Sequence, residues 1–395
     1  MNKKEVDFKK IKIVITAGGS GGHVTVALAV MQNLYERGIS RDEILFIGGD
    51  LNKGGDTKTG SVEQKMTEQI DSPKLFIRAG KLQRKFQISS ILLAMRSLLS
   101  LWDTLRIFLK IKPKIVISFG GYVSLPVGVV AKLFNRTIIL HEQTAAVGLA
   151  NKIVSLFSDK ILVNFESAKK YFRSKTVIHT GNPLRSIIFE KQKPSTDLSG
   201  QIHKNFLNKK NKPFIYITGG GQGSQLFNDL VLNNIIQLTN QYNILLQSGS
   251  YRYSQLRRRF NRLSKTMPAK NKNSIILTDF VQEEIGYVLQ NADVVVSRGG
   301  AGTISELGAL QKKSVIIPIK WVTHNEQFKN AKILSDIGLA IILDEDNINI
   351  NDFVNAIDTV LKKENPPQDL AKRIFKQNAA QEIGDLVLKY LSLNT

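Results

Sequence analysis

Short apolar runs alternate with helical patterns along the whole chain. The apolar runs lie at 11–17, 43–49, 114–119, 137–141, 160–165 and 176–180, and again at 214–221, 243–249, 274–280, 293–297, 314–319 and 340–344. Runs of this kind joined by helical crossovers predict parallel sheets covered by helices on both faces. The pattern restarts near residue 213, so the sequence predicts a second sheet.

The length of the chain also predicts two domains. At 395 residues it exceeds what one ordinary hydrophobic core supports. The turn-forming tripeptide 181–183 marks the expected boundary. We expect domains at 1–183 and 184–372, a loop over the basic segment 191–212 and helix over 366–392.

Composition narrows the class of protein. The hydrophobic and charged fractions, 42% and 22%, are those of a globular protein, and the absence of cysteine excludes disulfides and thiolate chemistry. The net charge of +22 fits nucleic acid, an anionic membrane surface or phosphorylated substrates as partners, although a general lysine bias would also explain it. No apolar core of a signal peptide and no stretch of about 20 uncharged apolar residues is present, so we expect no membrane span.

The segment 297–330 is the most informative part of the chain. Its first strand ends in a glycine turn that opens a helix containing Glu306, and its second strand leads to a helix containing Glu326, Gln327 and Asn330. Helix N-termini at the carboxyl edge of parallel strands favour phosphate binding, and a carboxylate one turn into the helix can accept hydrogen bonds from a ribose diol. The segment therefore predicts a nucleotide site.

Three polar loops follow strands of the first predicted sheet. They are 17–23 with four glycines and His23, 118–124 with Tyr122, and 141–144 with Glu142. The dinucleotide fingerprint is not met because Val24 occupies its third glycine position, which argues against an NAD enzyme. A neutral His23 beside the glycines is a candidate general base, while a structural capping role is the alternative. His141 and Glu142 are candidates for the same site, and the alternative is that they form a hydrogen-bonded pair that only shapes their loop.

A second glycine loop, 219–224, mirrors the first in the second sheet. It lacks the Gly-Lys-Ser/Thr of a Walker loop. Arg185, just past the boundary turn, is a candidate contact for a diphosphate, whereas Arg298 is expected either to do the same or only to brace its turn.

The segment from Lys81 to Lys114 combines apolar residues with cations. It contains eight basic residues against one acid, Asp103. An apolar helix surrounded by cations is typical of a membrane-surface element, and a core helix is the alternative. The candidate membrane residues are Lys81, Arg84, Lys85, Leu92, Leu93 and Trp102.

Eight motifs together resemble one family. GGSGGHV, FGGYVSLP, HEQTAAVGLANK, GNPLR, GGGQGS, QSG, RGGAGTISEL and NEQFKNA occur in order over roughly residues 11–340. In this combination and spacing they are similar to the MurG family of peptidoglycan N-acetylglucosaminyltransferases, glycosyltransferase family 28. The resemblance implies the α/β GT-B fold, with two Rossmann-like domains facing a deep cleft. It also implies that a C-terminal helix, 373–395, returns to the first domain.

The resemblance implies an inverting transfer of N-acetylglucosamine from UDP-GlcNAc to the C4 hydroxyl of undecaprenyl-pyrophosphoryl-N-acetylmuramyl-peptide. It implies no metal or other cofactor, no nucleic acid, and a peripheral protein on the cytoplasmic face of the cell membrane, with other cell-wall synthesis proteins as partners. The implied catalytic residues are His23, Tyr122 and Glu142. The implied donor-binding residues are Ser20, Gly21, Gly22, Thr144, Arg185, Gly221, Gln222, Ala301, Gly302, Thr303, Glu306, Gln327 and Asn330.

Four positions depart from the family pattern and bear on the substrate contacts. They are Val26, Thr144, Gly221 and Glu326. A carboxylate at Glu326 would repel a diphosphate unless it pairs with a cation such as Lys320 or Lys329. The alternative functions are transfer to another lipid such as diacylglycerol, and a non-catalytic module that binds nucleotide sugars or nucleic acid.

Overall fold

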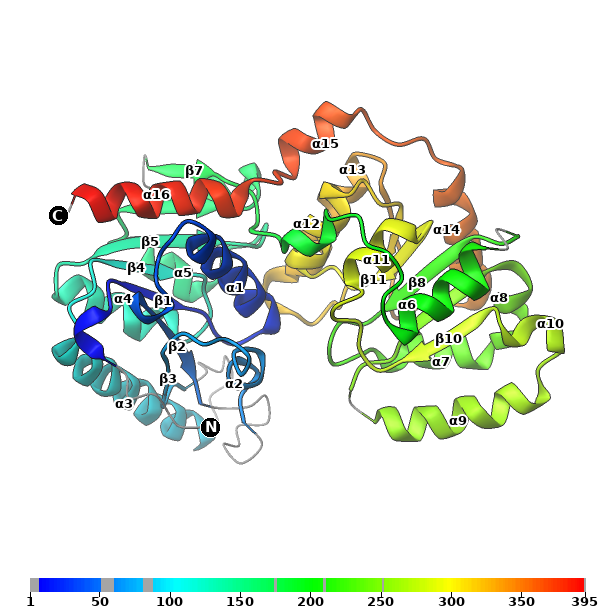
Figure 1. Ribbon diagram of the computed structural model, residues 1–395, viewed down its shortest axis with the longest axis horizontal. Coiled ribbons are helices and arrows are strands. Elements are labelled where there is room, and N and C mark those ends of the chain that lie inside the picture. The colour runs from blue at the N-terminus through cyan, green and yellow to red at the C-terminus, as the bar shows by residue number, and fades with distance from the viewer. Residues whose placement is uncertain are drawn as a thin grey trace. The chain divides into compact units, whose positions relative to one another are not determined.

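The computed structural model describes residues 7–50, 60–80, 88–173, 176–208, 211–250 and 252–393. The chain divides into two compact units, Met1–Arg185 with Lys376–Thr395, and Ser186–Phe375 (Figure 1). The expected boundaries, after 183 and after 372, differ from these by two and three residues.

The described residues of the first unit form a seven-stranded sheet in the order β3-β2-β1-β4-β5-β6-β7, in which all neighbouring strands are parallel. The strands are β1 Ile13–Thr16, β2 Ile44–Gly49, β3 Lys74–Ile77, β4 Ile115–Ser118, β5 Thr137–Glu142, β6 Lys160–Val163 and β7 Val177–His179. The α-helices are α1 Gly21–Glu36, α2 Val62–Met66, α3 Ile88–Lys110, α4 Ser124–Leu133, α5 Leu149–Val154 and α16 Ala379–Leu393. Short 3-10 turns are η1 Phe8–Lys10, η2 Arg41–Glu43 and η3 Glu166–Tyr171.

The described residues of the second unit form a six-stranded parallel sheet in the order β10-β9-β8-β11-β12-β13. The strands are β8 Phe214–Thr218, β9 Asn243–Gln247, β10 Ile275–Thr278, β11 Val294–Ser297, β12 Ser314–Ile316 and β13 Ala340–Ile342. The α-helices are α6 Asp197–Ile202, α7 Gln225–Asn233, α8 Ile235–Gln241, α9 Tyr253–Thr266, α10 Ala269–Lys272, α11 Ile285–Asn291, α12 Ala301–Ala309, α13 Glu326–Asp336, α14 Ile350–Lys362 and α15 Gln368–Ile374. A π-helix, η5 His203–Leu207, and 3-10 turns, η4 Ser186–Ile188 and η6 Thr323–Asn325, complete the unit.

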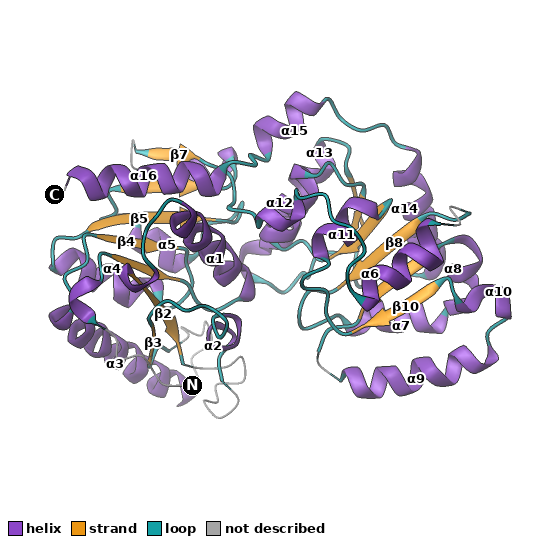
Figure 2. Ribbon diagram, viewed as in Figure 1, coloured by secondary structure: helices purple, strands orange, loops and turns teal. Residues whose placement is uncertain are grey.

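Alternation along the strands builds two cores in the first unit. On β1, Ile13 and Ile15 pack with α1 and α16, whereas Val14 packs with α3, α4 and α5 on the opposite face. All three side chains are fully buried, and burying each contributes about 1.5–3 kcal/mol. Figure 2 shows the resulting three layers, with each sheet lying between helices.

The C-terminal helix belongs to the first unit. Ile383 and Val387 of α16 lie in the core that also contains α1. An ion pair of 2.5 Å joins Arg37 at the end of α1 to Asp385. The predicted helix over 366–392 is therefore wrong in its continuity, because α15 ends in the second unit and the chain is not helical over 375–378.

Two further expectations need correction. Strand β3 was not predicted, since three of its four residues are only half-buried at the sheet edge. The basic segment 191–212 is not simply a loop, because α6 and η5 occupy much of it. Ile202 and Phe206, which lie four residues apart, are both buried and hold this segment against the second unit.

Strand order places the polar loops of each unit together. The order in which strands are added reverses between the neighbouring parallel strands β1 and β4 in the first sheet, and between β8 and β11 in the second, and each of these places is a switch point. Open α/β sheets bind ligands beyond the carboxyl ends of the strands at such a point. The loops that follow these four strands are therefore where a site is expected.

Candidate active site

Backbone packing joins the loops after β1 and β4. The Gly18 amide donates to the Gly120 carbonyl over 3.2 Å. Gly121 has a φ of +89°, and a Cβ at this position would lie 1.9 Å from the Gly18 carbonyl oxygen. No other residue fits there, so these glycines let two loops meet at the first switch point.

His23 lies in the first turn of α1, where Ser20 is the N-cap. The Ser20 hydroxyl oxygen accepts the His23 backbone N–H over 3.4 Å and lies 2.8 Å from His23 Nδ1. Burial lowers the pKa of His23 to about 4, against an opposing hydrogen bond to the backbone of Gly18. The imidazole is therefore neutral at pH 7 and able to accept a proton.

His141, at the end of β5, is fully buried. Its Nε2–H donates to the Gly181 carbonyl over 2.9 Å, which leaves Nδ1 as a buried acceptor with no hydrogen bond among the described residues. The pKa of His141 is lowered to about 4, chiefly by burial; the hydrogen bond to Gly181 opposes this shift and the nearby His23 adds to it, so the two rings lie close enough to interact.

Glu142 shapes its own loop. The carboxylate accepts hydrogen bonds from the Thr144 amide over 2.9 Å and hydroxyl over 2.8 Å, from Asn151 Nδ2 over 2.9 Å and from the Gly148 amide over 3.3 Å. Burial raises the pKa of Glu142, and these bonds oppose the shift. The same hydroxyl of Thr144 also contacts the Ala146 carbonyl. Both side chains are thus engaged within their loop, which is typical of a structural role.

A buried carboxylate that the sequence did not reveal holds the first glycine loop. Glu63 of α2 is 2% exposed. Its Oε1 accepts the Gly19 amide over 2.7 Å and the Tyr122 hydroxyl over 3.4 Å. Tyr122 is therefore anchored to the same carboxylate, and burial first, then the charge of Glu63, raises its pKa. Glu63 thus links the loop after β1, through Gly19, to the loop after β4, through Tyr122.

Unused polar atoms gather around these loops. Side-chain atoms that are buried and form no hydrogen bond among the described residues include those of Thr16, Ser118, Ser124, His141, Gln143, Asn151 and Asn182. Thr16 and Ser118 end the two central strands. Buried polar groups normally have partners, so this concentration indicates a place that holds a polar ligand or ordered water.

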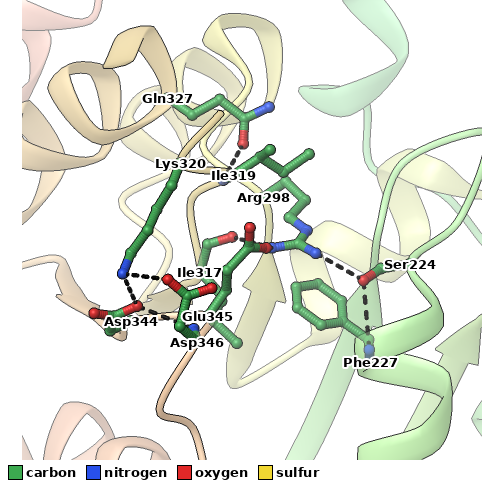
Figure 3. A network of polar contacts seen from close by, with 10 residues as sticks. All are labelled: Ser224, Phe227, Arg298, Ile317, Ile319, Lys320, Gln327, Asp344, Glu345 and Asp346. Carbon is green, nitrogen blue, oxygen red and sulfur yellow. Dashed lines mark hydrogen bonds and ion pairs between the residues drawn. The ribbon is translucent and has the colours of Figure 1, made fainter. Parts of the chain in front are cut away.

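Arg298 braces the loops at the switch point of the second unit. It donates through Nη1 to Glu345 over 2.5 Å and to the Ile317 carbonyl over 2.9 Å, and through Nη2 to the Ser224 hydroxyl over 3.0 Å. Its guanidinium lies 4.7 Å from the centre of the Phe227 ring. Figure 3 shows Arg298 with Ser224, Phe227, Ile317 and Glu345 around it. Of the two roles expected for Arg298, the bracing one is seen, and Glu345 was not predicted.

The glycine loop after β8 is equally constrained. Gly223 has a φ of +79°, and a Cβ there would lie 1.8 Å from the Ser248 carbonyl oxygen. Gly221 and Gln222, two of the predicted donor contacts, lie exposed on this loop. Gly221, one of the positions that depart from the family pattern, lies beside the Phe280 ring. A Cβ built on Gly221 would lie 3.4 Å from the nearest atom of that ring.

The N-terminus of α12 is open. Gly300 is its N-cap and no side chain caps the helix. A Cβ on Gly300 or Gly302 would meet nothing within 4 Å. Free N–H groups and the helix dipole favour an anion here. Thr303 and Glu306, one turn further on, are half-buried.

Helix α13 packs against the turn before α12. Asn330 is 1% exposed and its Nδ2 donates to the Gly299 carbonyl over 3.1 Å. Gln327 accepts the Ile319 amide over 3.0 Å through Oε1, which leaves its amide nitrogen available within the described structure. Glu326 is the first residue of α13, where a carboxylate is favoured by the helix dipole.

Lys320 is not the partner that the sequence suggested for Glu326. Its ammonium group contacts Asp344 over 2.5 Å and Asp346 over 2.7 Å. Arg185, the other cation predicted at the donor site, is the last residue of the first unit before Ser186.

The predicted membrane residues belong to α3 and to the segment that precedes it in the sequence. Lys81, Arg84 and Lys85 lie outside the described residues, and Leu92 and Leu93 fall within α3. Trp102 is 50% exposed and stacks with Arg106 at 4.9 Å. Along α3, Leu98 and Leu109 are also exposed. Asp103, the one acid of the segment, pairs with Arg78 over 2.6 Å.

Over the described ranges, no helix is long and apolar enough to cross a membrane. The same ranges contain no group of three or more His, Asp or Glu side chains arranged to hold a metal ion.

Comparison with known proteins gives the family. Residues 13–163 match the glycosyltransferase family 28 N-terminal domain, and residues 214–386 match its C-terminal domain. A protein of Caldicellulosiruptor saccharolyticus is 32% identical over 97% of this chain and 99% of its own length. It is named UDP-N-acetylglucosamine--N-acetylmuramyl-(pentapeptide) pyrophosphoryl-undecaprenol N-acetylglucosamine transferase. The chain belongs to the MurG family of glycosyltransferase family 28.

Other similarities agree with the MurG assignment. A Bacillus cereus protein with the same transferase name is 31% identical over 96% of this chain and 99% of its own. Among solved structures, MurG of Acinetobacter baumannii superposes with a TM-score of 0.65 at 23% identity, covering 96% of this chain and 99% of that one. A Neisseria meningitidis UDP-GlcNAc 2-epimerase bound to UDP-GlcNAc gives 0.60 at 14% identity, covering 96% and 100%. These structures confirm the GT-B fold expected from the sequence, with its two parallel-sheet domains.

Proposed function

We propose that this chain transfers N-acetylglucosamine from UDP-GlcNAc to the C4 hydroxyl of undecaprenyl-pyrophosphoryl-N-acetylmuramyl-peptide, with inversion at the anomeric carbon. Relatives of matching length have names that describe a transfer between these substrate classes. The observation that supports it most directly is the open N-terminus of α12 beside Gln327, because it provides anion-binding amides and a carboxamide nitrogen that is available within the described structure.

The second unit binds the donor in this proposal. The amides of Ala301, Gly302 and Thr303 hold the diphosphate, with the loop of Gly221 and Gln222 completing the contacts. Glu306 accepts hydrogen bonds from the ribose hydroxyls. Gln327 donates its free amide to the sugar, and Asn330 keeps that helix in register through the Gly299 carbonyl.

The first unit binds the acceptor and provides the base. His23 takes the proton of the C4 hydroxyl through Nε2, in the tautomer in which Nδ1–H donates to the Ser20 hydroxyl 2.8 Å away. Gly21, Gly22 and Tyr122 shape the surrounding surface. Glu142 and Thr144 contribute by holding the loop after β5 rather than by contacting the reacting atoms.

No metal or other cofactor is required in this proposal. The diphosphate charge is neutralised by the helix terminus and nearby cations. The acceptor's lipid stays in the bilayer, so the protein works as a peripheral protein at the cytoplasmic face of the cell membrane, beside other cell-wall synthesis proteins. Residues 81–114 provide the docking surface, of which Leu98, Trp102 and Leu109 are exposed and apolar.

An acceptor competition tests the proposed reaction. Purified protein with labelled UDP-GlcNAc is given either lipid I or diacylglycerol in equal detergent, and the labelled lipid product is separated and counted. We expect transfer only to lipid I. Transfer to diacylglycerol would assign the enzyme to another lipid acceptor, and UDP binding without transfer to either would make it a non-catalytic module.

Docking is tested separately from transfer. Co-sedimentation with anionic liposomes is expected to weaken when Lys81, Arg84 and Lys85 are reversed in charge and when salt reaches 1 M, where the Debye length falls to about 3 Å. Liposome binding that is unchanged both by the charge reversal and by 1 M salt would refute electrostatic docking and would favour the alternative that α3 is a core helix.

A further inference from the structure

Helix α9 of the second unit has a one-sided charge that the transfer reaction does not use. Between residues 252 and 272 the sequence contains eight lysines and arginines and no acid. Five of the 16 arginines of the chain lie within 252–262, so a general enrichment in lysine does not explain the cluster.

The geometry of α9 separates its apolar face from its basic one. Tyr253, Leu256, Phe260 and Leu263 pack against the core of the second unit. On the other side, Arg258, Arg262 and Lys265 are exposed, and a shallow hollow is lined by Gln255, Arg258, Asn261 and Arg262. Figure 1 shows α9 on the outside of its unit.

Only part of the positive charge is balanced within the protein. Arg259 pairs with Asp229 over 2.5 Å, and Arg257 donates to the Leu277 carbonyl over 3.0 Å. No ion pair forms at Arg258, Arg262 or Lys265 within the described structure. Arg258 and Arg262 stand four residues apart on one face, a like-charge arrangement that destabilises an isolated helix.

The cations continue beyond the end of the helix. Lys270 and Lys272 of α10 are exposed. Burial lowers the pKa of Lys212, and the neighbouring charge of Lys270 lowers it further, which indicates that positive groups crowd together here. A surface that keeps repelling charges together is expected to gain an anionic partner.

We propose that the exposed face of α9 is a second contact with an anionic membrane surface, independent of residues 81–114. The row of Gln255, Arg258, Asn261, Arg262 and Lys265 offers bidentate guanidinium and amide donors to phospholipid phosphates. The apolar face of α9 is partly buried and packs against the core of its own unit, so contact is electrostatic and without insertion. The two aromatic residues of α9 belong to this packed face and leave no ring on the outer face for bases to stack on, which disfavours single-stranded nucleic acid.

A unique label tests whether α9 touches the membrane. Because the chain has no cysteine, Asn261→Cys gives one site for a fluorophore, and Lys362→Cys on α14 gives a matched site elsewhere on the second unit. Vesicles of phosphatidylglycerol and phosphatidylcholine are expected to protect the label at 261 from acrylamide and leave the label at 362 quenchable. Bound protein with a freely quenchable label at 261 would overturn the proposal.

A charge-matched pair of variants tests the energetics. In 0.1 M salt, replacing Arg258, Arg262 and Lys265 by Gln is expected to lower partition onto these vesicles about 100-fold, at about fivefold per cation. The control replaces Lys362, Lys372 and Arg373 by Gln and changes net charge equally. An equal loss in both variants would show a net-charge effect only and overturn the proposal. Protection of label 261 by duplex DNA but not by vesicles would also overturn it, in favour of nucleic acid.

Discussion

Replacing Arg298 by Met should unfold the donor-side loops of the second unit rather than merely remove a ligand contact. The side chains of Arg298 and Glu345 are 15% and 13% exposed, so the pair is largely withdrawn from water. Removing one partner of a buried pair leaves the other charge uncompensated and costs about 3–5 kcal/mol. The residual exposure places this pair near the lower limit, at about 3 kcal/mol.

A double-mutant cycle separates pairing from general loss of packing. Glu345→Gln alone retains an acceptor for the guanidinium and should cost about 1 kcal/mol. In the double variant no charge is stranded, so it should be no less stable than Arg298→Met alone. The coupling energy is expected at about 1 kcal/mol or more, within the range seen for contacting residues.

Hydrogen exchange provides the measurement, because a two-unit chain need not unfold in one step. Amides of β8 and β11 report the stability of the second unit. Lys320→Met is the control, since Lys320 also contacts two carboxylates but is 47% exposed, and its loss should leave the exchange of these amides close to that of the wild type. The bracing role would be refuted if the free-energy changes of Arg298→Met and Glu345→Gln added to that of the double variant within about 0.5 kcal/mol. It would also be refuted if Arg298→Met weakened UDP binding and left hydrogen exchange unchanged.

Variants at four further positions probe the two sites. Glu63→Gln should lower kcat/KM by about 10- to 100-fold, since charged hydrogen bonds to Gly19 and Tyr122 are worth about 1.5–3 kcal/mol, and Glu63→Leu should lower it further; equal activity in steady-state assays would contradict this. His23→Ala should lower kcat about 10²–10⁴-fold with unchanged UDP affinity, and the wild-type rate should show no limb near pH 6.5, because the pKa of His23 lies at about 4. His141→Asn should flatten the acid dependence of stability in denaturant titrations: with its pKa lowered to about 4, the folded state binds fewer protons than the unfolded state, so wild-type stability falls from pH 6.5 toward pH 4. Glu306→Ala should weaken UDP binding in calorimetry by about 10-fold or more, through lost ribose hydrogen bonds, and equal affinity would remove Glu306 from the donor site.

The strands were predictable where burial on both faces leaves continuous apolar runs. This holds for the central strands β1, β4, β8 and β11, whose residues are all buried. It fails for β3, because an edge strand with half-buried residues needs no such run. It also fails at 197–207, where only Ile202 and Phe206 mark a segment that is otherwise polar.

The helix predicted over 366–392 fails for a tertiary reason. Phe375 follows α15 and is 2% exposed. Its ring packs so closely on Gly308 of α12 that a Cβ built on this glycine would lie 2.4 Å from the ring. The packing of this ring on α12 ends the helix in the second unit before the chain enters the first. Local periodicity contains no information about such a contact.

The glycine loops were predictable, and the residues that hold them were not. Glycine turns after strands are local patterns, so loops 17–23 and 219–224 stand out in the sequence. Glu63 lies 44 residues from Gly19, and Glu345 lies 47 residues from Arg298, in segments with no motif of their own. Only the folded chain brings each carboxylate to its loop.

In both units a charged side chain from outside the motif stabilises the glycine loop. A loop must be glycine-rich to pack backbone on backbone, as at Gly121 and Gly223, yet glycine loses more conformational entropy on ordering than any other residue. A buried charged group outside the motif offsets this cost: Glu63 accepts an amide of the first loop, and Arg298, held by Glu345, donates to Ser224 at the end of the second. Charge-assisted hydrogen bonds in a water-excluded place are stronger than neutral ones and cannot be exchanged for water. The shape of both glycine loops is thus fixed by contacts within the chain, and it depends as much on these three side chains as on the glycines themselves.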